Sequence, residues 1–226
     1  MRMRLKKHLD ERIAATGDVL VAREAEKFYQ MMDEEKRTFN LDLSKVFANS
    51  DNPLLLEIGC GKGAFAIQSA KNHPERNYLA VEKLSNVIVV ACEQAAEQNL
   101  PNLKFLNCRA ENLTCYLPPD SVDEILLNFS CPYPKKTYAN RRLTSKNFLA
   151  IYQSLLKSGG KIRLKTDNKD FFDYSLESLP LGGFCVTDVC YDLPENAADN
   201  VVTEYEAKFR ALGMPIYALV AEKENI

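Results

Sequence analysis

Three glycines at alternate positions follow an apolar run in the sequence LLLEIGCGKGAF (54–65). At a strand-to-helix turn, Gly59, Gly61 and Gly63 would let the backbone pass close beneath a ligand. The spacing is compatible with a dinucleotide loop and with an S-adenosyl-L-methionine loop. Glu57 favours the methyl donor, because a carboxylate beside the turn would repel a pyrophosphate but can help hold the ammonium group of a methionine moiety. A turn that only packs a helix on a strand is the structural alternative.

An acidic residue also ends the next apolar run. The sequence NYLAVE (77–82) predicts a strand that finishes at Glu82. A carboxylate at this place can accept hydrogen bonds from both hydroxyls of a ribose. NAD enzymes share this arrangement, so Glu82 indicates a bound nucleoside without choosing between the two ligands.

The stretch NFSCPYPKK (128–136) combines rigidity with charge after a further apolar run. Pro132 and Pro134 each fix one φ angle, so we expect a stiff loop that aims Lys135. Tyr133 on this loop is a candidate stacking surface for a base, and plain packing is the alternative. The basic residues of this region form one cluster: Lys135, Lys136, Arg141, Arg142 and Lys146. Such a cluster on an acidic chain can mark a polyanion site, although a solvated surface is the simpler explanation.

Two short polar motifs lie further along the chain. In KTDN (165–168), Asp167 is a candidate for contact with a base, or the N-cap of the following helix. In TEYE (203–206), Thr203 can cap the helix EYEAKFRAL while Glu206 reaches back, which is a capping box. A helix N-terminus also suits an anion, so the capping role does not conflict with contact to a phosphate.

Short apolar runs alternate with helical patterns after Pro53. The predicted strands cover residues 54–59, 77–82, 102–108, 122–129, 161–167, 184–193 and 215–223. The predicted helices cover residues 63–72, 85–98, 145–157, 169–178 and 204–212. Gly159 and Gly160 are expected to end the third helix. This alternation predicts an α/β fold with an open, doubly wound, mostly parallel sheet, which binds ligands beyond the carboxyl ends of its strands.

Residues 1–50 are interpreted as a separate basic and helical extension, and residues 51–226 as the main domain. The sequence AREAEKFYQMMDEEKR (22–37) predicts one helix, whereas the rest of the extension has weak periodicity.

The composition excludes several other classes of protein. The 226 residues are 46% hydrophobic with a net charge of −2, and no apolar run is long enough to cross a membrane. The basic N-terminus lacks the apolar segment of a secretory signal. Seven cysteines without a C-x-x-C, together with two histidines, argue against a disulfide framework and a zinc site. We therefore expect a cytoplasmic protein without metal or membrane contact.

The longer stretch NFSCPYPKKTYANRRLT (128–144) resembles the signature of the bacterial tRNA (guanine-N7-)-methyltransferases. EIGCGKG, KTDN and TEYE agree with that family in order and spacing, and the resemblance covers nearly the whole chain from Asp51 on. It implies a Rossmann-like seven-stranded sheet with an antiparallel C-terminal strand and helices on both faces. It further implies S-adenosyl-L-methionine as cofactor, tRNA as partner, and methylation of guanine N7 in the variable loop. A monomer or a homodimer is expected.

The resemblance and the patterns together assign the site residues. The cofactor-binding candidates are Glu57, Gly59, Gly61, Gly63, Glu82, Arg109, Ala110, Glu111, Asn128 and Cys131. The substrate-binding candidates are Lys135, Arg141, Arg142, Asp167, Thr203, Glu204, Tyr205 and Glu206. Cys131 and Asp167 occupy the candidate catalytic positions.

The sequence departs from the family pattern at four positions. Cys131 stands at the family's aspartate, Tyr133 at its tryptophan and Tyr138 at its histidine. Arg109 stands where an acidic residue is frequent near the adenine, so Glu111 or the backbone of Ala110 is expected to take that role.

The implied chemistry needs no general base, because guanine N7 carries a lone pair and no proton. Catalysis then depends mostly on orientation, which suits a site without histidine. A cysteine can also attack carbon, so a thiolate nucleophile at Cys131 is the competing idea. Two other functions stay open: a tRNA-binding relative with weakened activity, and a small-molecule methyltransferase.

Overall fold

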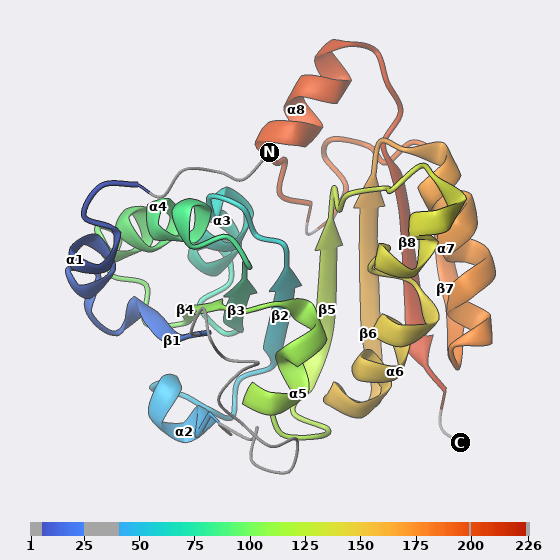
Figure 1. Ribbon diagram of the computed structural model, residues 1–226. Helices are drawn as coiled ribbons and strands as arrows, with labels where there is room; N and C mark the ends of the chain where they lie inside the picture. Colours follow the sequence, from blue (N-terminus) through green and yellow to red (C-terminus); the bar gives the residue numbers. More distant parts are fainter. Residues whose placement is uncertain (1–5, 25–40, 199, 225–226) are drawn as a thin grey trace. The chain divides into compact units, whose positions relative to one another are not determined.

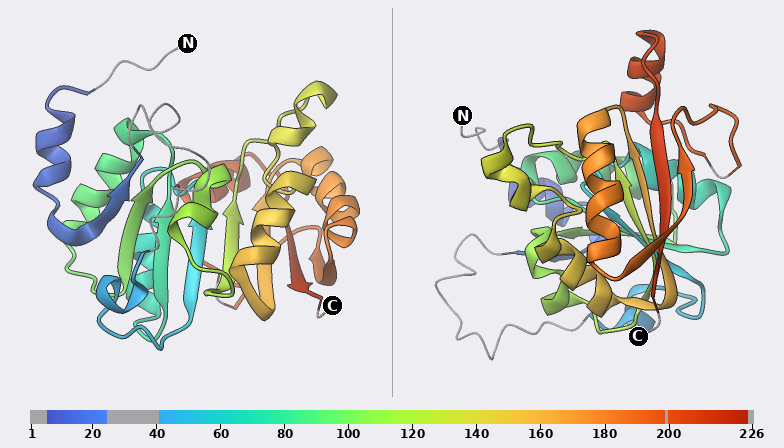
Figure 2. Two further views of the ribbon diagram at one scale, coloured as in Figure 1. Left: turned by 60° about the horizontal axis from the view of Figure 1, so that its bottom comes forward. Right: turned by 90° about the vertical axis from the view of Figure 1, so that its right-hand side faces the viewer.

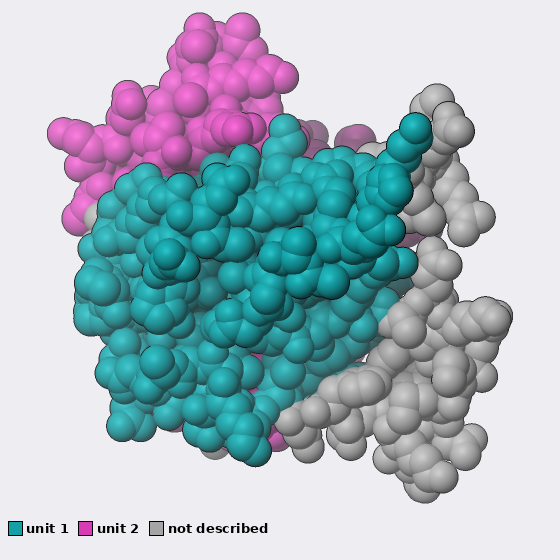
Figure 3. All heavy atoms as spheres, turned by 90° about the vertical axis from the view of Figure 1, so that its left-hand side faces the viewer, with its two compact units in different colours: residues 1–116 teal, residues 117–226 magenta. Residues whose placement is uncertain are grey.

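The computed structural model describes residues 6–24, 41–198 and 200–224. The chain forms two compact units, residues 1–116 and residues 117–226, which have separate colours in Figure 3. In both units, strands alternate with helices along the sequence (Figure 1). Within the described residues, no helix is long and apolar enough to cross a membrane.

Unit 1 is built on four parallel strands. These are β1 (Leu20–Arg23), β2 (Leu54–Ile58), β3 (Asn77–Val81) and β4 (Leu103–Asn107), in the order β1-β4-β3-β2. Every residue of β2, β3 and β4 is buried. Nearly continuous apolar runs of this kind are typical of parallel strands that are covered on both faces.

Helices cover the strands of unit 1 on both sides. In Figures 1 and 2, α3 (Ala64–Asn72) and α4 (Ser85–Ala96) lie on one face and the short α5 (Leu113–Tyr116) on the other. The N-terminal helix α1 (Leu9–Ala14) packs on α4, where Arg12 and Glu93 form an ion pair with an N–O distance of 2.6 Å. The remaining short elements are α2 (Leu43–Val46) and the 3-10 turns Gly17–Val19 and Ala110–Asn112.

Unit 2 contains the antiparallel part of the fold. Its strands are β5 (Val122–Asn128), β6 (Leu156–Thr166), β7 (Phe184–Cys190) and β8 (Tyr217–Lys223), in the order β5-β6-β8-β7. The pair β5–β6 is parallel, and β8 runs antiparallel to both of its neighbours.

Three helices and one 3-10 turn complete the described part of unit 2. The helices α6 (Lys146–Leu155) and α7 (Lys169–Leu181) lie side by side, and a 3-10 turn spans Lys136–Arg141. The helix α8 (Glu204–Ala211) lies beyond the end at which β5 and β6 finish (Figure 1). The loops that could bind a ligand therefore gather at this end of the unit.

The predicted α/β class, the mostly parallel strands and the antiparallel C-terminal strand are confirmed. The prediction of seven strands is wrong, because the described residues hold eight, four in each unit. The additional strand β1 comes from the N-terminal segment and pairs with β4. Ala22 and Arg23, predicted as helical, belong to β1, and the predicted helix from residue 25 onward lies outside the described residues. The division into an extension and a domain at residue 50 stays a prediction.

Gly159 and Gly160 lie inside a strand rather than after a helix. The helix α6 already ends at Leu155, and β6 begins at Leu156 with a register irregularity before Lys161. Gly159 has a φ of 69°, and a Cβ on Gly160 would approach the Lys157 carbonyl oxygen to 2.9 Å. The two glycines therefore allow the irregular start of β6 instead of ending a helix.

Candidate functional site

The glycine loop of unit 1 leaves open space beside its backbone. Gly59, Gly61 and Gly63 have φ angles of 87°, 57° and 80°, which side chains rarely adopt. A Cβ on Gly59 or Gly61 would meet no atom within 4 Å, whereas one on Gly63 would lie 2.8 Å from Cβ of Ala91. Packing of a helix on a strand therefore accounts for Gly63 only. The first two glycines leave a cradle that a ligand can fill.

The loop is held against the end of the neighbouring strand. The backbone N–H groups of Gly59 and Cys60 both donate to the Val81 carbonyl, at 2.8 and 3.0 Å. This places the turn directly beside Glu82, which follows β3.

Two carboxylates accompany this loop in the predicted places. Glu57 lies in β2 and is 3% exposed, while Glu82 is half-buried and accepts a hydrogen bond from the Leu84 N–H at 2.9 Å. Burial raises the pKa of the Cys60 thiol well above its usual range, and the charges of Glu57 and Glu82 raise it further. Burial and the two nearby acids therefore favour the neutral thiol of Cys60 over the thiolate.

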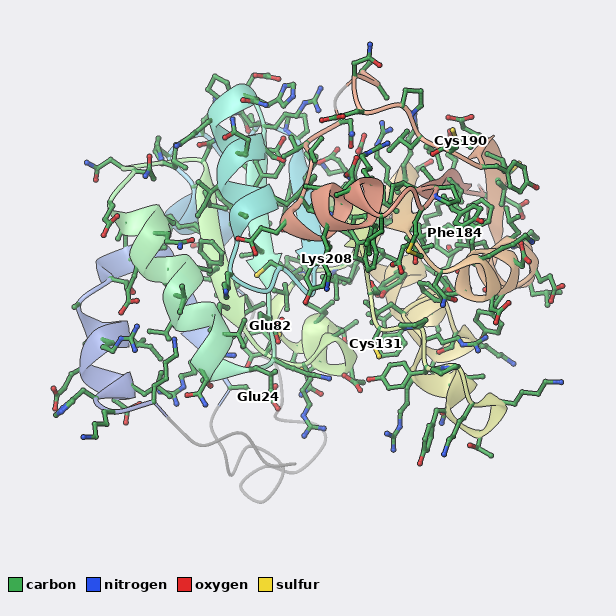
Figure 4. The ribbon with its side chains drawn as sticks, turned by 90° about the horizontal axis from the view of Figure 1, so that it is seen from above. Glu24, Glu82, Cys131, Phe184, Cys190 and Lys208 are labelled. Carbon is green, nitrogen blue, oxygen red and sulfur yellow. The ribbon has the colours of Figure 1, made fainter. Side chains whose placement is uncertain are left out.

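The loop after β4 is the third part of unit 1 at this end of the strands. Arg109 and Glu111 are exposed, Ala110 is half-buried and Asn112 is buried. The carboxylate of Glu24, from the end of β1, accepts hydrogen bonds from the Arg109 N–H and from Asn112 Nδ2. Figure 4 looks onto this end of the strands and labels both Glu24 and Glu82. Glu24 was not predicted as a site residue.

In unit 2, the stretch after β5 has a strained backbone. Phe129 and Tyr133 have φ angles of 48° and 41°, in the left-handed region that costs a side chain roughly 1–2 kcal/mol. Cys131, labelled in Figure 4, lies between them and is exposed. Strain of this size persists only where surrounding contacts hold the backbone in place.

Arg142 supplies those contacts. Its Nε donates to the Pro132 carbonyl at 3.0 Å, and its Nη2 donates to the Tyr133 carbonyl at 3.1 Å. The guanidinium carbon lies 4.4 Å from the ring centroid of Tyr174 in α7, and the residue is only 8% exposed. The structure thus gives Arg142 a role in holding the loop, while its predicted contact with substrate stays a prediction.

The other members of the basic cluster are accessible. Lys135, Lys136, Arg141 and Lys146 are exposed, and the Arg141 guanidinium lies 4.6 Å from the ring centroid of Tyr138. Among the predicted basic contacts, exposure thus distinguishes Arg141 from Arg142.

Asp167 is not the cap of α7. The N-cap is Asn168, whose side chain accepts a hydrogen bond from the Phe171 N–H at 2.9 Å. Asp167 immediately precedes this cap and is half-buried, so its carboxylate has no capping role.

The TEYE motif contains a cap and a buried ion network. Thr203 Oγ1 accepts the Glu206 N–H at 3.0 Å, as predicted for the cap of α8. The carboxylate of Glu206 is fully buried and accepts hydrogen bonds from Lys165 Nζ at 2.9 Å and from Arg210 Nη2 at 2.8 Å. Asn200 Nδ2 donates to it as well, at 2.9 Å. Glu206 therefore attaches α8 to β6 instead of presenting its carboxylate to solvent.

The exposed part of the motif belongs to an aromatic stack. The ring of Tyr205, a residue that is 60% exposed, lies nearly parallel to those of Phe129 and Phe209, with all three centroid distances between 6.0 and 6.4 Å. Phe209 was not predicted as part of the site, and no supporting role was predicted for Phe129. Their supporting role depends on α8 packing beside the β5 loop, which no local pattern indicates.

The predicted site residues are divided between the units. Glu57, the three glycines, Glu82 and residues 109–111 lie in unit 1 at the carboxyl ends of its strands. Asn128, at the end of β5, lies in unit 2 with Cys131, the basic cluster, Asp167 and the TEYE motif. Among the described residues, no group of three or more His, Cys, Asp or Glu side chains could hold a metal ion.

Comparison with known proteins identifies related sequences over most of the chain. A family model described as "Putative methyltransferase" matches residues 51–219. A tRNA (guanine-N(7)-)-methyltransferase from Bacillus subtilis is 40% identical over 223 residues, covering 98% of this chain and 99% of the relative. The enzyme of the same name from Lachnoclostridium phytofermentans is 45% identical over 183 residues, covering 80% and 85% of the two chains.

Solved structures show a similar fold at low sequence identity. The 16S rRNA methyltransferase KamB has a TM-score of 0.60 at 18% identity, covering 77% of this chain and 89% of that one. A 16S rRNA (adenine(1408)-N(1))-methyltransferase from Catenulisporales acidiphilia, solved with its cosubstrate SAM, also has a TM-score of 0.60 at 18% identity. That match covers 82% of this chain and 93% of the other.

The alternating strands, the glycine cradle and the paired acids are typical of Rossmann-like α/β proteins that bind a nucleoside, and the family model makes this chain a methyltransferase of that class. Within that class, the sequence identity to the named relatives over nearly the full length of both chains decides the family. The chain belongs to the tRNA (guanine-N(7)-)-methyltransferase family.

Proposed function

We propose that this protein transfers a methyl group from S-adenosyl-L-methionine to N7 of a guanine in tRNA. The observation that carries the proposal is the open cradle at Gly59 and Gly61 with Glu57 and Glu82 beside it. The relatives of nearly equal length support the reaction by their names. The protein would act in the cytoplasm as a monomer or a homodimer, with residues 51–226 as the methyltransferase domain after an extension of residues 1–50.

The residues of unit 1 fit the cofactor. Glu57 lies beside the turn and suits the ammonium group of the methionine moiety, while Glu82 suits the ribose hydroxyls. The cradle lets the chain between these two groups pass close to the backbone at Gly59 and Gly61. When bound, the cofactor supplies a sulfonium methyl group, which is the electrophile of the reaction.

The protein's part in the chemistry is to position the groups. Guanine N7 attacks carbon with its own lone pair, so no side chain has to remove a proton. In-line placement of the reacting atoms can contribute roughly 7–11 kcal/mol. The half-buried Asp167 suits recognition of the N1–H and N2–H₂ donors on the guanine edge.

The exposed residues of unit 2 suit tRNA. Lys135 and Arg141 are exposed cations, which suits contact with phosphates, and Thr203 and Glu204 lie at the N-terminus of α8. The exposed ring of Tyr205 is backed by Phe129 and Phe209, which makes it a platform on which a base can stack.

Cys131 occupies the position of the family's aspartate and is exposed. A thiol is only a weak hydrogen-bond acceptor, so this position contributes less to binding than a carboxylate would. It is the feature that favours the second candidate, a tRNA-binding relative with weakened activity.

A methyl-transfer assay tests the proposal. Labelled S-adenosyl-L-methionine and unmodified tRNA should give N7-methylguanosine, and tRNA with 7-deazaguanine at the acceptor position should give none. Calorimetric titration should show binding of S-adenosylhomocysteine and no binding of NAD. Methylation of a small molecule but not of tRNA would contradict the proposal, and tRNA binding without methylation would support the second candidate.

A further inference from the structure

Glu24 reaches the loop after β4 from a distant part of the sequence. Its Oε2 accepts the backbone N–H of Arg109 at 2.9 Å, and its Oε1 accepts Asn112 Nδ2 at 3.0 Å. Its own N–H donates to the Asn107 carbonyl at 2.8 Å. Both the main chain and the side chain of Glu24 therefore hold the end of β4 and the turn that follows.

The hydrogen bonds from Glu24 reach the 3-10 turn that follows β4 from another part of the chain. The 3-10 turn Ala110–Asn112 begins after Arg109, whose side chain makes no capping hydrogen bond. The Arg109 side chain is exposed. Glu24 instead accepts the backbone N–H of Arg109 and the side-chain amide of Asn112, at the two ends of the turn.

The strand order shows which part of the cofactor this loop would meet. In unit 1 the glycine loop follows β2, Glu82 follows β3, and the Arg109–Asn112 loop follows β4, in the spatial order β4-β3-β2. Neighbouring strands are about 4.8 Å apart. A nucleoside that places its amino-acid part at β2 and its ribose at β3 therefore places its base at β4.

We propose that Glu24 is a positioning residue of the cofactor site, which fixes the Arg109–Asn112 loop that receives the adenine. The inference rests on the proposed function. Recognition of a base edge requires a backbone whose position is fixed before the ligand arrives, because ordering a loop on binding weakens affinity. The N-terminal segment of the chain thereby takes part in cofactor binding.

Calorimetric titration of the full chain with S-adenosylhomocysteine tests this role. Glu24→Ala should weaken binding about tenfold, since a hydrogen bond to a charged group is lost and the turn loosens. Glu24→Gln keeps one acceptor and should lie between the parent and Glu24→Ala. Glu97→Ala and Glu97→Gln, at an exposed acid elsewhere in unit 1, should bind like the parent.

Three further readouts separate positioning from a general loss of stability. Adenosine should lose affinity by the same factor as S-adenosylhomocysteine, because the effect lies at the base. In methyl transfer, KM for S-adenosyl-L-methionine should rise while kcat stays unchanged. Hydrogen exchange at the Arg109 amide should be faster in Glu24→Ala in the absence of any ligand.

Equal affinity of the parent and Glu24→Ala for S-adenosylhomocysteine would overturn the inference. Failure of the parent itself to bind would overturn the proposed function, and this inference with it. The two failures are distinguished by the parent's titration alone.

Discussion

The guanidinium of Arg142 is bonded to the carbonyl of Tyr133 at 3.1 Å, and that tyrosine has a φ of 41°. A buried cation thus holds a strained backbone beside Cys131, while the preceding residue in the chain, Arg141, is exposed. Two adjacent arginines that look equivalent in the sequence therefore have separable effects.

Replacing each arginine by alanine should reveal this difference. Arg141→Ala should lower the slope of log affinity for tRNA against log salt by about one unit and leave the Tm unchanged. Arg142→Ala should destabilise the fold by about 3 kcal/mol, because two carbonyls lose buried donors, and should leave the salt slope unchanged. Thermal unfolding and binding at several salt concentrations measure both. Arg142→Lys is the control, since it keeps the charge but cannot bridge both carbonyls. A fall in salt slope for Arg142→Ala at unchanged Tm would contradict this division.

The ion network around Glu206 predicts a dependence of stability on pH. Burial raises the pKa of Glu206, but the hydrogen bonds from Asn200 and Arg210 and the charge of Lys165 lower it more, so the net pKa is lowered. The folded state then binds fewer protons than the unfolded state. The resulting stability is present above the unfolded pKa and is lost as the pH falls through the folded pKa.

Glu206→Gln should therefore be less stable than the parent at neutral pH, by about 3 kcal/mol, because Lys165 and Arg210 lose their buried partner. The difference should shrink as the pH is lowered below the unfolded pKa. Urea denaturation across that pH range measures it. Glu204→Gln, at an exposed residue of the same helix, is the stability control. A difference that is the same at every pH would show that Glu206 is not held as a carboxylate.

Cys131 offers a test of how the methyl group is transferred. Because N7 has no proton to lose, Cys131→Ala should retain activity with a mild loss. Cys131→Asp should equal or exceed the parent in kcat/KM, since a charged hydrogen bond is worth roughly 1.5–3 kcal/mol. Steady-state kinetics measure these changes, and mass spectrometry of the protein during turnover checks for a methyl group on the thiol. A methylated Cys131, or complete inactivity of a folded Cys131→Ala, would favour the thiolate nucleophile.

Alanine substitutions at Gly61 and at Gly63 should have different effects on stability and on cofactor affinity. Gly63→Ala places a Cβ 2.8 Å from Ala91 and 3.2 Å from Phe105, so it should lower the free energy of unfolding by about 1–3 kcal/mol. Gly61→Ala meets no atom within 4 Å, so it should cost only the roughly 1 kcal/mol of its left-handed backbone. Its larger effect should be on cofactor affinity, because the Cβ enters the cradle. Chemical denaturation and titration with S-adenosylhomocysteine separate the two. Equal destabilisation by both changes would contradict the distinction.

The sequence predicts those strands of this fold that are marked by an apolar run within the strand itself. The runs that became β2, β3 and β4 are short, nearly continuous and apolar, and such runs are typical of buried parallel strands. The four residues LVAR of β1 lack such a signal. The last two of them were predicted as part of the helical pattern that follows, so the strand was missed. Gly159 and Gly160 were placed wrongly for a related reason, because glycine marks a helix end and an irregular strand equally well.

Side-chain roles in the site depend on partners far along the chain. The carboxylate of Glu206 pairs with Lys165, 41 residues earlier, so the motif alone indicated a cap and a substrate contact. The distinction between Arg141 and Arg142 depends on Tyr174 in another helix. The glycine loop and its acids were predictable, because their roles follow from the turn itself.

The N-terminal strand β1 pairs with one side of β4, so that side of β4 is not an edge of the sheet. Leu20 and Ala22 pair with Phe105 and Leu106, so β1 covers that side of a strand whose residues are all buried. A shortened chain that begins at Asp51 would leave this side of β4 open as an unprotected edge. Such an edge is a template for pairing with other chains and for aggregation. We therefore expect that removing the segment before the region matched by the family model would promote aggregation.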